Sequence, residues 1–115
     1  MEATQKRIEV YQTPQGRLPF IEWLRGLRDQ RAKQKIQARL DRLRLGNLGS
    51  SRSVGEGVQE LKIDYGPGYR VYFGQRGEKL VIFLCGGDKS TQDDDIKKAK
   101  EFWKAYKEEG SYANR

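Results

Sequence analysis

The stretch "GVQELKIDYGPGYRVYF", from Gly57 to Phe73, decides the fold of this 115-residue chain. Successive side chains of a strand point to opposite faces, so the first half places Leu61 and Ile63 on one face. The second half places Val71 and Phe73 on one face in the same way. The letters "DYGPG" between the two halves are typical of a turn. The whole stretch therefore predicts a β-hairpin with one apolar face directed toward the core.

The spacing of apolar residues predicts further elements on both sides of this hairpin. In chain order we expect a strand over residues 7–13, helices over 19–27 and 30–45, a Gly/Ser-rich loop over 46–57, a strand over 79–85 and a helix that follows Thr91. The strand "KLVIFLC" is apolar on both faces, as in a central strand covered on both sides. The predicted architecture is one α+β domain spanning residues 1–115, with two N-terminal helices and a C-terminal helix packed on a small, mainly antiparallel sheet.

The charge of the chain favours a negatively charged partner. The formal net charge is +7, and residues 1–57 hold twelve of the 23 basic side chains but only six of the 16 acidic ones. Such an excess is typical of proteins that bind a polyanion or an acidic protein surface.

Other features of the composition narrow the chemistry and the compartment. The chain has no histidine, which is the commonest general acid or base and the commonest metal ligand. Cys85 is the single cysteine, so no disulfide framework is expected and a reducing cytoplasm is the natural setting. The first residues lack the apolar stretch of a signal peptide. No window approaches the roughly 18 apolar residues of a membrane span, so we expect a cytoplasmic protein without a membrane partner.

The second face of the predicted hairpin carries the first candidate site. Lys62 and Arg70 are expected within one or two cross-strand positions of each other, with Tyr72 next along that face. Two cations and an aromatic ring suit an RNA backbone and a stacked base. The alternative is a solvated face on which the cations pair with Glu60 and Asp64.

A second candidate site lies in "GGDKSTQ", directly after the central strand. Gly86 and Gly87 would let a ligand or another backbone come close, and Asp88 could orient Lys89 beside the sheet. The alternative is a plain strand-to-helix turn, with glycine for geometry and Ser90 or Thr91 as a cap.

Two charged runs complete the set of candidates. Arg39 and Arg42 lie on the basic helix over residues 30–45, which could contact nucleic acid or an acidic partner or could simply be solvated. Asp93, Asp94 and Asp95 favour a helix start stabilised by the helix dipole, not a metal site. We therefore predict no metal ligands and no cofactor.

Two stretches together resemble a known family: "GVQELKIDYGPGYRVYF" and "LCGGDKSTQDDDIKKAKEFWKAY". With their spacing they resemble the addiction-module killer proteins, the HigB-like branch of the RelE/ParE superfamily of type II toxins. The chain length, the two N-terminal helices and the basic charge agree with this likeness, which covers essentially the whole chain. The resemblance implies a RelE-like fold.

The resemblance also implies an activity and its partners. It implies a bacterial toxin held inactive by a cognate antitoxin, usually a helix-turn-helix protein, and an endoribonuclease (mRNA interferase) that cuts mRNA on the ribosome and inhibits translation. By matched position, Lys62, Arg70 and Lys89 would be the catalytic residues. Tyr72, Asp88, Arg39 and Arg42 are the predicted RNA-binding residues.

The sequence departs from some relatives. Some HigB relatives use histidines, which this chain lacks, and some RelE relatives use a tyrosine near the C-terminus, for which only Tyr106 and Tyr112 are candidates. ParE relatives share the fold but poison gyrase. Two other functions therefore stay open: a ParE-like gyrase inhibitor without RNase activity, and a non-toxic basic module that binds nucleic acid.

The residues suggest how RNA would be cut without a metal. The 2′-hydroxyl would attack the adjacent phosphorus, and this reaction needs a base, an acid and stabilisation of the phosphorane. Arg70 suits the phosphorane because its planar fork matches two non-bridging oxygens. Lys62 or Lys89 would act as a base or as a fixed positive charge. We expect positioning and electrostatics to supply most of the catalysis.

Overall fold

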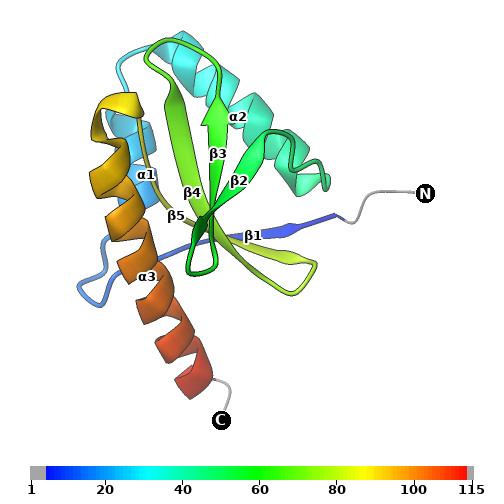
Figure 1. Ribbon diagram of the computed structural model, residues 1–115, viewed down its shortest axis with the longest axis vertical. Helices are drawn as coiled ribbons and strands as arrows, with labels where there is room; N and C mark the ends of the chain where they lie inside the picture. The colour runs from blue at the N-terminus through cyan, green and yellow to red at the C-terminus, as the bar shows by residue number, and fades with distance from the viewer. Residues whose placement is uncertain (1–4, 114–115) are drawn as a thin grey trace.

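A computed structural model describes residues 5–113 of the chain, with the side chains of residues 5–109. Its elements (Figure 1) are β1 (Arg7–Val10), α1 (Pro19–Gly26), α2 (Gln30–Arg44), β2 (Ser51–Gly55), β3 (Val58–Ile63), β4 (Tyr69–Arg76), β5 (Leu80–Gly87), the 3₁₀ turn η1 (Lys89–Thr91) and α3 (Gln92–Ala113). No helix in the described part of the chain is long and apolar enough to cross a bilayer.

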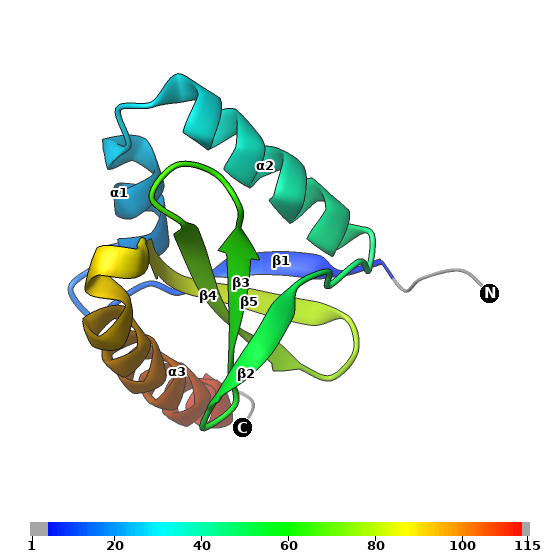
Figure 2. The ribbon, with the colours of Figure 1, turned by 45° about the horizontal axis from the view of Figure 1, so that its top comes forward.

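One five-stranded sheet organises the chain, in the order β1-β5-β4-β3-β2. The β2–β3, β3–β4 and β4–β5 pairs are antiparallel, and β1 alone runs parallel to its neighbour β5. The prediction of an α+β fold with a mainly antiparallel sheet is confirmed. The turn between β3 and β4 lies next to the start of α2 (Figure 2), where the Tyr65 hydroxyl donates to Asp29 Oδ2 over 3.2 Å.

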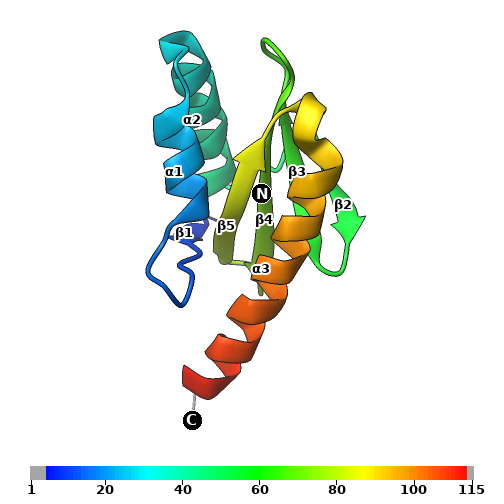
Figure 3. The same cartoon turned by 90° about the vertical axis from the view of Figure 1, so that its left-hand side faces the viewer.

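The sheet separates two apolar clusters. Figure 3 shows α1 and α2 on one side of the sheet and α3 on the other. The cluster on the α1–α2 side contains Phe20, Ala32, Ile36, Leu40, Leu43, Leu61, Ile63, Tyr69, Val71, Phe73, Val81 and Phe83. The cluster on the α3 side contains Tyr11, Val58, Tyr72, Ile82, Leu84, Cys85, Ala99 and Trp103. Val81 and Phe83 of β5 enter the first cluster, and Ile82, Leu84 and Cys85 enter the second, so the prediction of a central strand covered on both faces is confirmed.

The segment expected as a loop over residues 46–57 contains an edge strand. Ser51–Gly55 pairs with β3, and Arg52 stands opposite Glu60 in the ladder. The Arg52 Nε atom donates to Glu60 Oε1 over 2.9 Å across the two strands. The prediction was wrong because this strand is short, polar and glycine-bounded. This segment is a strand because it pairs with β3, and the alternation of apolar and polar residues within the segment gives no sign of that pairing.

Two glycines of the sheet allow tryptophan rings to pack against the backbone. A Cβ atom at Gly74 would lie 2.3 Å from the Trp103 ring, and one at Gly86 would lie 2.3 Å from the Trp23 ring. A Cβ atom at Gly87 would meet the Asp95 carboxylate in the same way. The protein's own side chains thus fill the space that a Cβ atom would take at both glycines after the central strand, while Gly86 also lines a cavity of about 570 Å³.

This packing predicts opposite effects for two glycine substitutions. Gly74→Ala should lower the free energy of unfolding by about 1–3 kcal/mol, because the new methyl group overlaps the Trp103 ring. Gly26→Ala is the matched control, since a Cβ atom there meets nothing within 4 Å. Because Gly26 lies in helix α1, Gly26→Ala should raise the free energy of unfolding by about 0.4–1 kcal/mol. Chemical denaturation of both variants checks this, and equal effects would contradict the proposed contact between Gly74 and Trp103.

Candidate functional site

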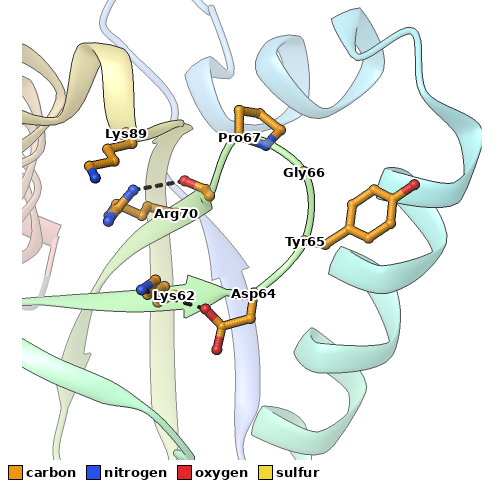
Figure 4. Close-up of a pocket in the computed structure, with 8 residues that line it drawn as sticks. Lys62, Asp64, Tyr65, Gly66, Pro67, Arg70 and Lys89 are labelled. Carbon is orange, nitrogen blue, oxygen red and sulfur yellow. Dashed lines mark hydrogen bonds and ion pairs between the residues drawn. The ribbon is translucent and has the colours of Figure 1, made fainter.

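A cleft of about 390 Å³ opens at the turn end of the β3–β4 hairpin (Figure 4). It is lined by Lys62, Asp64, Tyr65, Gly66, Pro67, Gly68, Arg70 and Lys89. The turn itself depends on glycine, because Gly66 and Gly68 have φ values of 56° and 82°. The lining carries three cations and one carboxylate, so the cleft favours an anion.

The three predicted catalytic residues come together in this cleft. Lys62 and Arg70 are direct cross-strand partners of β3 and β4. Lys89 arrives from η1 beyond the end of β5, and Figure 4 shows its side chain beside that of Arg70. Lys62 is half-exposed and lies 3.5 Å from Asp64, an exposed carboxylate. The alternative prediction, in which the cations of this face pair with Glu60 and Asp64, therefore holds for Lys62 and Asp64 within the cleft.

Arg70 is buried, although it lies on the hairpin face that was predicted to point away from the core. Only 7% of its surface is accessible. Its Nη1 atom donates to the Gly68 carbonyl over 2.8 Å, and its Nε atom lies 3.7 Å from Glu60 Oε2. The arginine reaches the cleft from inside the protein, because α3 covers the neighbouring part of this sheet face. An Arg70 substitution therefore changes both the cleft and the interior.

Tyr72 does not offer a ring for base stacking, and that prediction is wrong. The side chain is fully buried in the cluster beneath α3. Its hydroxyl donates to Glu60 Oε2 over 3.0 Å. Burial raises the pKa of the Tyr72 phenol, and the negative charge of Glu60 adds to the effect. Alternation correctly placed Tyr72 on the face of Arg70, but the helix that covers that face is a tertiary feature.

Glu60 is a buried hydrogen-bonding centre behind the cleft, a role that its place in the strand pattern does not reveal. The carboxylate is 3% exposed and accepts hydrogen bonds from Arg52, Tyr72 and Gln92. Burial opposes ionisation, but these three hydrogen bonds outweigh it and lower the pKa of the Glu60 carboxyl. The signal available in the sequence was a glutamate on the same strand face as Lys62. Nothing in the sequence indicated that Gln92, at the start of α3, would reach it.

Like Tyr72, the other three predicted RNA-binding residues lie outside the cleft lining. Arg39 is buried and donates to the carbonyl groups of Asn47 and Leu48. It holds the loop after α2, so its interpretation as an exposed contact is wrong. Arg42 is exposed on α2. Asp88 was expected to orient Lys89. Its carboxylate instead caps η1, where it accepts a hydrogen bond from the Ser90 backbone N–H over 2.8 Å.

Asp95 of the acidic run and Tyr106 near the C-terminus make contacts within the protein, away from the cleft. Asp95 is buried beside β5 and accepts a hydrogen bond from the Thr91 hydroxyl; burial raises the pKa of its carboxyl. Thr91 stands directly before α3, but this bond is not the expected backbone cap. Tyr106 donates to Glu9 Oε1 and stacks on Trp103, outside the cleft lining. The Tyr112 side chain lies outside the described residues.

The cleft is chemically suited to a phosphodiester. An arginine supplies paired donors for two phosphate oxygens, while lysines act as point charges. Arg70 lines the cleft, and Nη1 donates the hydrogen bond that its guanidinium makes to the Gly68 carbonyl. Within the described side chains, no group of three histidine, cysteine, aspartate or glutamate residues could hold a metal ion together.

Comparison with known proteins identifies the family. A Haemophilus influenzae protein described as an uncharacterized protein is 58% identical over 83 residues, which cover 72% of this chain and 84% of the relative. No solved structure matches the chain. The profile of the family described as "Phage derived protein Gp49-like (DUF891)" matches residues 22–114. The chain belongs to this Gp49-like family, which is related to the RelE/HigB superfamily of type II toxins.

Proposed function

We propose that the protein is the toxin of a type II toxin–antitoxin system and acts as a ribosome-dependent mRNA endoribonuclease. The observation that carries this proposal is the convergence of Lys62, Arg70 and Lys89 in one cleft. These residues come from three separate elements. Membership of a toxin-like family supports the biological role, and the cation set supports a phosphodiester as the substrate.

In the proposed reaction, the 2′-oxygen of one nucleotide attacks the adjacent phosphorus. A P–O2′ bond forms as the 2′-hydroxyl gives its proton to solvent water, and the P–O5′ bond breaks as the leaving 5′-oxygen takes a proton from solvent. The products are a 2′,3′-cyclic phosphate and a 5′-hydroxyl. Arg70 stabilises the negative charge of the phosphorane, because its guanidinium is already fixed before substrate arrives. Lys62 and Lys89 flank the same phosphate as positive charges. The ribosome contributes the extended geometry of the mRNA codon.

A cognate antitoxin is the second proposed partner. The toxin-like family implies an antitoxin, and we infer a helix-turn-helix protein encoded beside this chain. Both the ribosome and the antitoxin place the action of this protein in the cytoplasm.

The first prediction tests the proposed function in cells. Induced expression of the wild-type protein should arrest bacterial growth and create new mRNA 5′ ends inside translated codons. Co-expression of the neighbouring antitoxin gene should restore growth and remove those ends. Mapping of 5′ ends with and without the antitoxin measures both effects. Inhibited DNA supercoiling without new mRNA ends would favour gyrase as the target, and normal growth with abundant folded protein would contradict toxicity.

The second prediction separates catalysis from stability. Lys62→Ala removes a half-exposed side chain, so the free energy of unfolding should change by no more than about 0.5 kcal/mol. Single-turnover cleavage on programmed ribosomes should fall by roughly 10²-fold, the scale for losing one donor to the transition state. Lys97→Ala removes the same charge from an exposed position of α3 and should cut at the wild-type rate.

Arg70→Ala extends this comparison. It should lower the cleavage rate similarly and also lower the free energy of unfolding by about 1–3 kcal/mol, because Glu60 then loses a buried charge partner. Melting curves for all three variants accompany the kinetics. A well-folded Lys62→Ala protein that cuts as fast as Lys97→Ala would remove Lys62 from the proposed site.

The third prediction concerns metal ions. We expect the protein's own cations to stabilise the scissile phosphate, since the described side chains offer no metal cluster. An mRNA with sulfur in place of a non-bridging oxygen at that phosphate binds manganese better than magnesium. Cleavage of this substrate on intact ribosomes should be equally slow with magnesium alone and with added manganese. Restoration of the rate by manganese would show a metal at the reacting phosphate.

A further inference from the structure

The Glu60 carboxylate connects three elements behind the cleft. Its Oε1 atom accepts a hydrogen bond from Arg52 of β2 over 2.9 Å. Its Oε2 atom accepts from the Tyr72 hydroxyl of β4 over 3.0 Å and from Gln92 Nε2 of α3 over 2.9 Å. Glu60 does not line the cleft and is 3% exposed, so it has no access to a substrate. Hydrogen bonds to both of its oxygens leave the carboxylate little freedom to turn.

Arg70 stands between this carboxylate and the cleft. Its Nε atom is the one buried side-chain nitrogen or oxygen without a hydrogen bond among the described side chains. That nitrogen lies 3.7 Å from Glu60 Oε2, as an ion pair without a direct hydrogen bond. On the cleft side, Nη1 donates to the Gly68 carbonyl over 2.8 Å. Because the guanidinium is planar, these two constraints fix the direction of Nη2 as well.

We propose that Glu60 is a positioning residue, which holds the Arg70 guanidinium so that the Nη2 nitrogen faces the scissile phosphate. This inference rests on the proposed RNA cleavage. The attraction between the two buried charges is weakly screened, because little water separates them. It keeps Arg70 in one rotamer before substrate binds. Gln92, the first residue of α3, donates to the same carboxylate, so Glu60 contacts both the helix start and Arg70.

The test is the variant Glu60→Gln, which keeps the size of the side chain and removes its charge. At saturating ribosome concentration, the single-turnover rate should fall by about 10²-fold, the scale for misplacing a reacting group by about 1 Å. The ribosome concentration at half-saturation should stay unchanged, because Lys62 and Lys89 still bind the RNA. Asp95→Asn is the matched control, since it neutralises another buried carboxylate, in the first turn of α3, and should leave the rate unchanged.

Two further measurements separate positioning from a general loss of structure. In an Arg70→Ala background, Glu60→Gln should have no further effect on the rate, because the group that it positions is gone. If Glu60→Gln fails to fold, Gln92→Ala takes its place and should lower the rate with the same unchanged half-saturation. A folded Glu60→Gln protein with the wild-type rate, or rate losses that multiply in the Arg70→Ala background, would overturn the proposal.

Exchange of the Arg70 Nε–H proton with solvent, followed by NMR, tests positioning without any reference to activity. The wild-type proton should be protected, and it should exchange faster in Glu60→Gln but not in Asp95→Asn. If the wild-type protein cuts no mRNA on ribosomes, the proposed function fails, and the exchange measurement alone decides whether Glu60 fixes Arg70. Equal protection in wild type and Glu60→Gln would overturn the positioning role.

Discussion

Coverage of the sheet on both faces is the constraint on which the rest of the structure depends. β4 and β5 lie between α1 and α2 on one side and α3 on the other, so nearly every side chain of these strands is enclosed. Enclosed positions exclude charge unless a partner is present. Charge can reach solvent only where the helices stop, and the turn of the β3–β4 hairpin is such a place. The cleft is located there for this reason.

The sequence predicted the elements whose signal is local. Alternation in "VQELKID" and "YRVYF" identified β3 and β4 and placed Lys62 beside Arg70, and these residues are direct ladder partners. Strong apolar periodicity identified all three α-helices. The edge strand over Ser51–Gly55 gave no such signal, because its order depends on pairing with β3. Local pattern thus sufficed where burial is strong and failed where a partner strand supplies the structure.

The surroundings of the site were harder to predict than its cations. Alternation assigns Tyr72 to a face but cannot say which helix covers that face, so an enclosed phenol was interpreted as an exposed ring. Arg39 belongs to a basic helix, yet its guanidinium binds two loop carbonyl groups. Both errors have one cause. Whether a polar side chain meets solvent or a distant backbone is a tertiary property, and residue spacing within one element does not contain it.

The burial of Arg70 joins stability to the proposed chemistry. A freely exposed arginine carries about 2 kcal/mol of rotamer entropy, which it must lose when it fixes a phosphate. Here the fold removes that freedom in advance, through Glu60 on one side and the Gly68 carbonyl on the other. Enclosing the charge has a cost of its own, which the fully buried Val71 and Phe73 on the opposite face of the same strand help to offset. The apolar face of β4 therefore supports the proposed function of its polar face, because it holds in place the strand whose buried arginine, Arg70, is ordered before any substrate arrives.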